Sequence, residues 1–200
     1  MPDRGPAQPS DEALAARAAG GELAAFEALV NRYGGAVLRA LERLGLDRHA
    51  AEDAAQDAWV KLFGALDQYH RDRAFRPWLF SIALNQGRDA RRRATARARI
   101  GGEELGRVDV ERTVLPNESA LERDAIAYAL AQLDEVFREA VVLVDVSGLD
   151  YDQAAVALGC AIGTVKSRVH RGREAFRAEY ARAVDGGALR SVARLSGADE

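Results

Sequence analysis

The sequence predicts an all-α protein made of two small helical domains that a flexible linker joins, and three observations support this prediction. Apolar residues recur at spacings of three and four along most of the chain, which is the period of an amphipathic helix. Nowhere does the sequence sustain the alternation of apolar and polar residues that is typical of a half-buried strand. The helical period stops between Thr95 and Ser119, where glycines and a Pro–Asn pair indicate a linker.

The expected domain organisation follows from these changes in composition. The first residues are rich in proline and glycine, which is typical of a disordered tail. The last residues contain no strong helical pattern and are expected to form a second tail. The expected segments are a tail at 1–10, a helical domain at 11–94, the linker at 95–118, a second helical domain at 119–183 and a tail at 184–200.

The charge of the chain is unevenly distributed. The formal net charge is −3, but basic residues crowd into 88–99 and 166–182, whereas acidic residues collect at 103–122. A mildly acidic protein can therefore still bind nucleic acid through local basic surfaces, while its acidic stretches restrain non-specific binding.

The sequence also predicts where the protein works. Cys160 is the only cysteine, so an internal disulfide is impossible and a reducing compartment is indicated. No apolar run approaches the ~20 residues that a membrane span needs. The N-terminal residues lack the apolar core of a signal peptide. We therefore expect a cytoplasmic protein without a membrane span.

In the N-terminal domain the apolar spacing predicts at least three helices. Apolar residues at helical spacing run from Ala24 to Leu44, and Gly34–Gly35 either interrupt this helix or are tolerated inside it. A second helix is expected from about Ala50 to Leu66. A third is expected to begin at Pro77, because proline suits the first position of a helix. Together they predict a small helix bundle.

One face of the helix expected at Ala50–Leu66 is acidic. Asp53, Gln56 and Asp57 cluster on the side opposite its apolar residues. Such a cluster can dock a basic partner, because charge complementarity favours the register and the rate of association. The alternative is a solvated face whose acids are favourable near a helix N-terminus. The residues alone leave both alternatives open.

The next segment combines aromatic residues with arginines. Residues 67–76 form a polar loop that includes Tyr69 and Arg76, and the helix that follows passes Asn85 into an arginine-rich end. Cations that track a backbone and aromatics that stack on bases are typical of a surface for single-stranded DNA. The alternative is that the aromatic residues are core and the arginines form a frayed basic end. The candidate arginines of this helix are Arg88, Arg91 and Arg92.

Residues 148–177 predict a helix-turn-helix within a C-terminal domain of about four helices. Asp150 is placed as the N-cap of a first helix from Tyr151 to Leu158, and Gly159 suits a left-handed C-terminal cap. The second helix is expected from about Ile162 to Arg177. Its outer face carries the candidate DNA-binding residues Thr164, Lys166, Ser167, Arg168, Arg171 and Arg173.

That outer face has the chemistry for binding duplex DNA. Its cations can neutralise phosphates, which gives affinity. Polar residues in the first turns of the helix can reach base edges in the major groove, which gives specificity. The alternative is a solvated amphipathic helix whose arginines only keep it soluble.

The sequence contains no pattern of a catalytic or metal site. His49, His70 and His170 are scattered, and a single cysteine does not supply a typical zinc ligand set. No phosphate-binding glycine loop or nucleophile motif is present. We therefore expect a protein that is not an enzyme and that needs neither a metal nor a cofactor.

Four motifs occur in a fixed order along the chain: AFEALVNRY (25–33), AEDAAQDAWVKLF (51–63), FRPWLFSIALN (75–85) and GLDYDQAAVALGCAIGTVKSRVHRGR (148–173). Together they resemble the bacterial RNA polymerase sigma factors of the extracytoplasmic-function (ECF) group, in the sigma-70 family. The resemblance covers about residues 11–182, and this combination of motifs is far more specific than a helix-turn-helix alone.

The resemblance implies a function for each surface. The acidic cluster matches the family's helix that docks on a coiled coil of the largest subunit of core RNA polymerase, and the family also contacts the polymerase flap. The loop at Tyr69–Arg76 and the helix after it match the region that holds the −10 element as its strands separate. The face from Thr164 to Arg173 matches the helix that reads the −35 element as duplex. An anti-sigma factor that covers these surfaces is also implied.

Some positions depart from the family pattern. Leu84 stands where the family usually has an arginine beside the asparagine at position 85, so contacts with the −10 element can differ. Cys160 and Ala161 replace a common aliphatic–proline turn, and Val156 stands where an acid is usual.

We therefore expect a sigma initiation factor, which binds core RNA polymerase, directs it to promoters through −35 and −10 elements and assists promoter melting. The alternative is a stand-alone helix-turn-helix regulator that binds duplex DNA without polymerase. That alternative explains the helix-turn-helix but leaves the acidic helix and the arginine-rich surface without a role.

Overall fold

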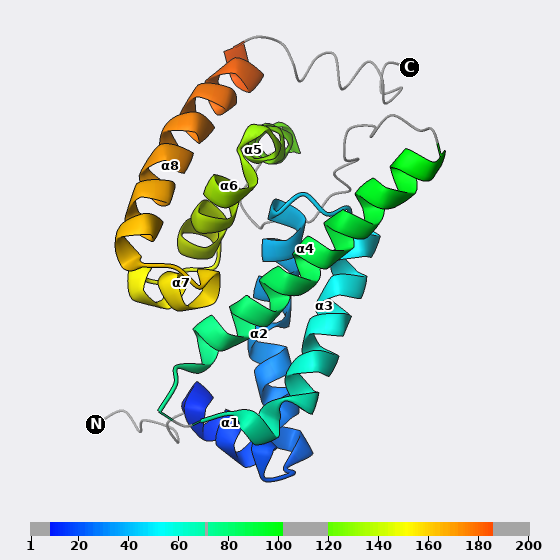
Figure 1. The fold of residues 1–200 in the computed structure, drawn as a ribbon, viewed down its shortest axis with the longest axis vertical. Coiled ribbons are helices and arrows are strands. Elements are labelled where there is room, and N and C mark those ends of the chain that lie inside the picture. Colours follow the sequence, from blue (N-terminus) through cyan, green and yellow to red (C-terminus); the bar gives the residue numbers. More distant parts are fainter. Residues whose placement is uncertain (1–8, 71, 102–119, 186–200) are drawn as a thin grey trace, which may run out of the picture.

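The structure is a computed structural model that describes residues 9–70, 72–101 and 120–185, and every element in these ranges is helical, which confirms the all-α prediction (Figure 1). Most of the expected linker and of both expected tails lies outside the described residues. The N-terminal domain contains α1 (Asp11–Ala19), α2 (Leu23–Arg43), α3 (Arg48–Gly64), the 3-10 turn η1 (Leu66–Gln68) and α4 (Phe75–Gly101). The C-terminal domain contains α5 (Ala120–Gln132), α6 (Glu135–Val141), the π-helical segment η2 (Val142–Val146), α7 (Tyr151–Leu158) and α8 (Ile162–Asp185).

Side-chain caps begin two helices of the N-terminal domain. The Ser10 hydroxyl accepts a hydrogen bond from the backbone N–H of Ala13 at 3.1 Å and so caps α1. The Asp47 carboxylate does the same for α3, from the N–H of Ala50 at 2.8 Å. The glycine pair Gly34–Gly35 is tolerated, since α2 continues through both residues.

The core of the N-terminal domain lies between α2, α3 and α4. Leu29, Leu62 and Phe80 are among its largest fully buried side chains. Gly87 allows α4 to approach α2 closely, because a Cβ there would lie 2.9 Å from Cδ2 of Leu41. This packing fixes the position of the arginine-rich helix relative to the acidic face of α3.

Helix α4 differs from its expected bounds at both ends. It begins at Phe75, so Pro77 occupies the third helical position rather than the first. Proline is tolerated there, because the first N–H groups of a helix have no intrahelical partner to lose. The helix also continues past residue 95, where the linker was expected to begin, as far as Gly101.

The helix-turn-helix has the predicted local structure. Asp150 and Gln153 form a capping box, in which the Asp150 carboxylate accepts from the Gln153 backbone N–H at 2.8 Å. Gly159 has a φ of 64°, the left-handed conformation that favours glycine. Helix α8 begins at the expected residue but continues well past Arg177, its expected end.

The helical stretch from Glu135 to Val146 is only partly α-helical. The α-helix ends at Val141, and the chain continues as the π-helical segment η2. Asp134 precedes α6, but its side chain makes no capping hydrogen bond. Segments of π-helix are rare and are often found at functional positions, and η2 is one of the parts that contact the N-terminal domain.

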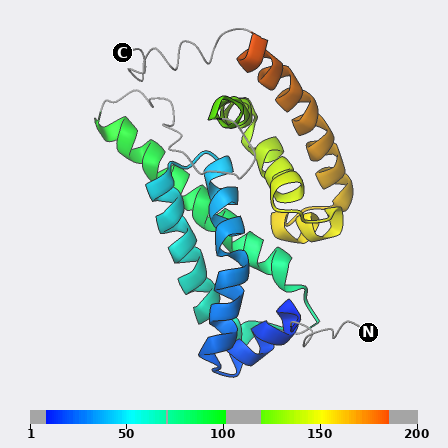
Figure 2. The same cartoon turned by 180° about the vertical axis from the view of Figure 1, so that it is seen from behind.

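The two domains pack directly on each other. Helix α7 lies beside the beginning of α4, and η2 lies against α2 (Figures 1 and 2). One hydrophobic cluster continues across the boundary, since it contains Leu41 and Phe80 of the N-terminal domain together with Leu143 and Val165 of the C-terminal domain. The domains therefore share apolar burial in this state.

Candidate functional site

Helix α8 presents a polar and cationic face to solvent and packs its apolar face on the rest of the domain. The apolar face includes Val165 and Val169, which are fully buried. Because a helix turns by about 100° per residue, the predicted DNA-binding residues lie on or beside the opposite face. Of these residues, Lys166, Ser167 and Arg171 are exposed, and Thr164, Arg168 and Arg173 are half-buried.

Two of the predicted DNA-binding arginines of α8 have partners inside their own domain. The Arg173 guanidinium donates to both carboxylate oxygens of Asp145 in η2, at 2.6 and 3.0 Å, and this hydrogen bonding raises the pKa of Arg173. A guanidinium nitrogen of Arg168 lies 3.9 Å from Sγ of Cys160, which is half-buried at the turn. These contacts distinguish the two arginines from the exposed cations of the same helix.

Tyr69, the aromatic residue predicted to contact the −10 element, packs on two neighbouring aromatic residues. Tyr69 stacks on Trp78 with ring centroids 5.0 Å apart, and both side chains are half-buried. The Tyr69 hydroxyl donates to the backbone carbonyl of Arg73 at 2.6 Å. Burial raises the pKa of Tyr69 to about 12, so the hydroxyl stays protonated at neutral pH. The ring of Phe75, which is fully buried, meets both other rings edge-on.

Arg88, one of the predicted single-strand-binding residues, is bound to the other domain. Its guanidinium donates to both carboxylate oxygens of Glu139 on α6, at 2.6 Å each. The side chain of Glu139 is only 3% exposed. The hydrogen bonds to Glu139 raise the pKa of Arg88. Asn85 is exposed beside this pair, and its amide oxygen accepts from Arg88 at 3.3 Å.

Two further arginines of α4 make contacts between the domains. Arg91 pairs with Glu135 of α6 at 3.0 Å. Arg76 donates to the backbone carbonyls of Ser147–Gly148 at 2.8 and 3.0 Å. Arg92 is different, because it pairs within its own helix and its side chain is 78% exposed. Three of the six predicted single-strand-binding residues therefore face the C-terminal domain.

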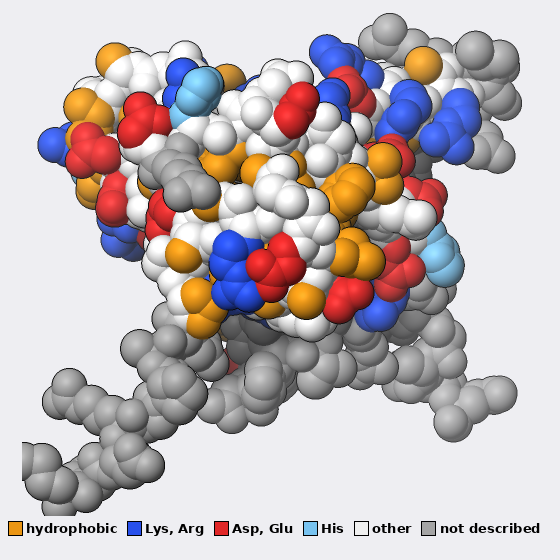
Figure 3. All heavy atoms as spheres, turned by 90° about the horizontal axis from the view of Figure 1, so that it is seen from below, with side chains coloured by type: hydrophobic (Ala, Val, Ile, Leu, Met, Phe, Trp, Pro, Cys, Tyr) orange, Lys and Arg blue, Asp and Glu red, His pale blue; other side chains and the backbone are white. Residues whose placement is uncertain are grey.

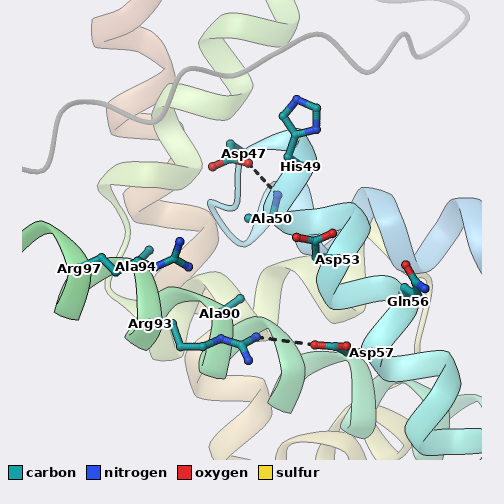
Figure 4. Close-up of a pocket in the computed structure, with 10 residues that line it drawn as sticks. All are labelled: Asp47, His49, Ala50, Asp53, Gln56, Asp57, Ala90, Arg93, Ala94 and Arg97. Carbon is teal, nitrogen blue, oxygen red and sulfur yellow. Dashed lines mark hydrogen bonds and ion pairs between the residues drawn. The ribbon is translucent and has the colours of Figure 1, made fainter.

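The residues that match the polymerase-docking helix line or border an open groove between α3 and α4, with a volume of about 850 Å³ (Figure 4). Asp53 and Asp57 of α3 stand opposite Arg93 and Arg97 of α4, and Gln56 is exposed beside them. The Arg93 guanidinium is 3.7 Å from the Asp57 carboxylate, and both side chains are more than half exposed. An exposed pair of this kind contributes little stability, so Asp57 remains available to a competing cation.

The charged residues of α6 are functional candidates that no sequence motif identifies. A signal does exist, because Arg138 and Glu139 stand in the otherwise largely apolar stretch that ends at Val146, and both are buried. Buried charges normally require a partner. Arg138 donates to the backbone carbonyl of Leu44 at the end of α2, at 3.2 Å, and burial lowers its pKa. The sequence alone therefore indicates that these two residues make contacts, but it does not identify the groups that they contact.

Charge on the surface is local rather than continuous. Figure 3 shows one face, on which acidic, basic and hydrophobic side chains are intermixed. Within the described ranges, no three histidine, cysteine, aspartate or glutamate residues are grouped as a metal site requires. In the same part of the chain, no helix is both long and apolar enough to span a membrane.

Comparisons with known proteins identify both domains. The family model for sigma-70 region 2 matches residues 29–97, and the model for sigma-70 region 4 matches residues 123–176. The RNA polymerase sigma factor NccH of Alcaligenes xylosoxydans xylosoxydans is 37% identical over 172 residues, which cover 82% of this chain and 90% of NccH. The ECF RNA polymerase sigma factor SigE of Mycolicibacterium smegmatis is 35% identical over 181 residues, which cover 85% of this chain and 69% of SigE.

A solved structure agrees with these matches. The sigma factor RpoE in complex with the anti-sigma factor NepR, from Bartonella quintana, is 29% identical with a TM-score of 0.64, and the match covers 77% of this chain and 95% of that chain. The fold and these matches thus define a transcription factor built from two helical domains. The chain belongs to the sigma-70 family and is an RNA polymerase sigma initiation factor of the ECF group. These matches do not favour the alternative function, a stand-alone helix-turn-helix regulator that binds duplex DNA.

Proposed function

We propose that this sigma factor directs core RNA polymerase to promoters by binding a −35 element with α8 and a −10 element with α4, and that it assists strand separation. The observation that carries the proposal is the presence, in one sigma-70 chain, of an exposed cationic face on α8 and an arginine-rich helix α4 on a separate domain. A regulator that binds only duplex DNA needs the first of these surfaces alone.

Recognition of the −35 element as duplex is assigned to the exposed face of α8. Lys166 and Arg171 contact phosphates or base edges, and Ser167 adds a short polar contact in the major groove. The start of the helix also directs backbone N–H groups toward a phosphate. Arg173 has a different role, because its bond to Asp145 holds α8 on η2. Thr164 and Arg168 lie at the edge of the DNA-binding face and are assigned to the same duplex contact.

Recognition of the −10 element is assigned to α4 and the loop before it. Asn85 and Arg92 are exposed and can contact DNA in the present state. Arg76, Arg88 and Arg91 contact the other domain and become available when those contacts break. Flipping a base out of the stack costs a few kcal/mol, and one stacking contact returns about 1–3 kcal/mol. One aromatic platform is therefore enough to bias opening. The assigned residues are Tyr69, Arg76, Asn85, Arg88, Arg91 and Arg92.

Core polymerase is proposed to dock on the exposed face of α3. Asp53, Gln56 and Asp57 meet the coiled coil of the largest subunit, and a cation of the polymerase replaces Arg93 beside Asp57. The exchange costs little, because the Arg93–Asp57 pair is exposed. The C-terminal domain is expected to make the second contact, with the polymerase flap.

An anti-sigma factor is the proposed regulator. The structure of RpoE with the anti-sigma factor NepR supports this, because that sigma factor resembles the present chain over both domains. A protein of that kind would cover the surfaces of α4 and α8. We further propose that the factor acts in the cytoplasm, where the polymerase works, and that it performs no catalytic step of its own.

The proposal is tested by adding the purified protein to sigma-free bacterial core polymerase and a genomic template library of the source organism. Sequencing of the run-off transcripts should reveal new, discrete start sites that share two upstream elements. An absence of transcripts, together with binding to duplex DNA in the absence of core, would instead support a stand-alone regulator.

A further inference from the structure

The residues at the start of α4 give that helix little local support. Ala74 directly precedes α4, and alanine has no side-chain oxygen that could accept from the first backbone N–H groups. The sequence of the first turn contains no acidic residue but includes Arg76. A positive charge is unfavourable there, because the N-terminal end of a helix is itself partly positive. The helix that carries much of the proposed −10 site therefore needs a cap from elsewhere.

Glu12 of α1 supplies that cap. Its carboxylate accepts from the backbone N–H of Phe75 at 3.3 Å, although the two residues are 63 positions apart in the chain. Phe75 is the first residue of α4, so its N–H has no partner within the helix. Burial raises the pKa of Tyr69 most, and the charges of Glu12 and Asp11 raise it further, so the acidic end of α1 lies beside the loop before α4.

Helix α1 is held in place by α2. The Asp11 carboxylate accepts from the guanidinium of Arg32 and from the hydroxyl of Tyr33, both on α2. Leu14, in the next turn of α1, is buried in the core of the domain. Glu12 lies between these two anchored residues, so the position of its carboxylate is set by packing that does not involve α4.

Phe75 connects the cap to the aromatic residues of the loop. Its side chain is fully buried, and its ring meets those of Tyr69 and Trp78 at centroid distances of 6.1 Å each. Tyr69 in turn stacks on Trp78. The N–H that Glu12 holds and the ring on which Tyr69 packs belong to the same residue. A shift of the start of α4 would therefore move Tyr69 as well as Arg76.

We propose that Glu12 is a positioning residue for −10 recognition: from α1 it caps the start of α4 and so fixes the loop that presents Tyr69 and Arg76 to DNA. This inference rests on the proposed function, because it requires that loop to contact the −10 element. Glu12 acts through Phe75 and not by touching DNA. A loop without the cap adopts several arrangements and accepts different bases more equally, so base discrimination suffers before overall affinity does.

The test uses the full chain assembled with core polymerase. The templates are one promoter mapped by run-off sequencing and its single-base substitutions in the −10 and −35 elements. Discrimination is the ratio of the run-off yields from the original and the substituted template. Glu12→Ala removes the acceptor. Glu22→Ala is the matched control, because Glu22 pairs with Arg17 near the other end of α1.

We expect Glu12→Ala to lower discrimination at the −10 element about fivefold, the size of effect that the loss of a typical cap produces. Discrimination at the −35 element and affinity for core polymerase should stay unchanged, and Glu22→Ala should behave like the wild type. A general fall in yield with unchanged −10 discrimination would overturn the proposal, and so would equal losses of discrimination at both elements.

A second substitution tests whether Glu12 acts by capping. Ala74 is exposed, and Ala74→Ser gives α4 a side-chain cap of its own. In that background Glu12→Ala should lower −10 discrimination by less than about twofold, and an equal loss in both backgrounds would overturn the capping mechanism. If circular dichroism shows that Glu12→Ala loses helical content, Glu12→Gln replaces it. A smaller loss of discrimination is then expected, because the amide oxygen still accepts, and no loss would count against the proposal.

Hydrogen exchange at the Phe75 amide, measured by NMR on the full chain without polymerase, separates the cap from the proposed function. Glu12→Ala should speed this exchange about fivefold, whereas Glu22→Ala should not. Equal exchange in all three proteins would overturn the proposal. Transcription by the wild type that does not depend on a −10 element, with the faster exchange still observed in Glu12→Ala, would remove the proposed function and leave the cap in place.

Discussion

Helices α4 and α8 both carry several arginines, but the two helices differ in what those arginines contact. On α8, Lys166 and Arg171 extend into solvent, while Arg173 is held within its own domain. On α4, Arg88 and Arg91 are bound by acidic residues of the opposite domain. The surface proposed for duplex DNA is therefore complete in the closed molecule, whereas the surface proposed for single-stranded DNA is not.

This difference shows that the arginine content of a helix does not by itself define a nucleic-acid surface, because the partner of each guanidinium decides whether it is available. It also matches the order of events in promoter recognition. Duplex DNA is present before melting, so its binding surface can be open from the start. Single strands appear only afterwards, so a surface that opens later limits binding to unrelated nucleic acid.

The largest expected effect is on the docking of core polymerase, which involves α3 and neither of these two helices. Asp53→Arg with Asp57→Arg should weaken binding to core polymerase by about 100-fold or more, since like charges placed against each other cost several kcal/mol. Titration of labelled factor with core polymerase measures this affinity. Binding of the variant to duplex DNA through α8 should stay unchanged. An unchanged affinity for core polymerase would mean that this face of α3 is only a solvated surface and does not dock the polymerase.

A smaller effect is expected on the open surface of α8. Lys166→Ala and Arg171→Ala should each weaken binding to the mapped −35 duplex by about 1–3 kcal/mol and leave core binding intact. Arg182→Ala is the control, because Arg182 is an exposed arginine farther along the same helix. Fluorescence anisotropy with duplex and single-stranded probes distinguishes the surfaces. Equal losses on both probes would contradict the separation of roles between α8 and α4.

The packing that presents α8 can be weakened without touching any DNA-binding residue. Gly172→Ala should destabilise the protein by about 1–3 kcal/mol, because the new Cβ would lie 2.6 Å from Cγ2 of Val141 and 3.1 Å from the carbonyl of Phe137. Gly163→Ala in the same helix meets open space and should leave stability unchanged or raise it by up to about 1 kcal/mol. Urea unfolding followed by circular dichroism measures both, and similar stabilities would exclude the close contact.

The smallest expected effect separates Arg92, a largely exposed guanidinium that pairs only within its own helix, from Arg173, which is held on another element. Arg92→Ala should reduce the salt dependence of single-strand binding by about 0.7, because one phosphate contact is lost. Arg173→Ala should leave the salt dependence of duplex binding unchanged, and should lower the free energy of unfolding by about 0.2–1 kcal/mol, since its pair with Asp145 is partly exposed. A weaker salt dependence of duplex binding in Arg173→Ala would indicate that Arg173 contacts DNA after all.

Element boundaries were predictable where an interaction between near neighbours fixes them. The bounds of α7 follow from the capping residue Asp150 and from Gly159, because caps depend on adjacent backbone groups. The beginning of α4 was not predictable in the same way, since Pro77 is compatible with more than one position in the first turn. The change from α6 to a π-helical segment has no recognisable signal in the residues around Val142.

The sequence by itself determined the kinds of surface that this protein carries. The helical period places Arg171 opposite the buried valines of α8 and Lys166 beside that face, and it places Asp53 and Asp57 away from the apolar side of α3, because these relations need only the geometry of one helix. The motifs in their order were also sufficient to indicate the family.

Only the tertiary structure decided which cations have partners. Arg88 is 51 residues from Glu139 along the chain, and Arg76 is 71 residues from Ser147. Contacts over such separations depend on how two domains dock, and docking is driven by apolar area that α7 and η2 bury against α4 and α2. No local pattern encodes that choice, so the binding of the α4 arginines by the C-terminal domain emerges only when both domains are folded and packed together.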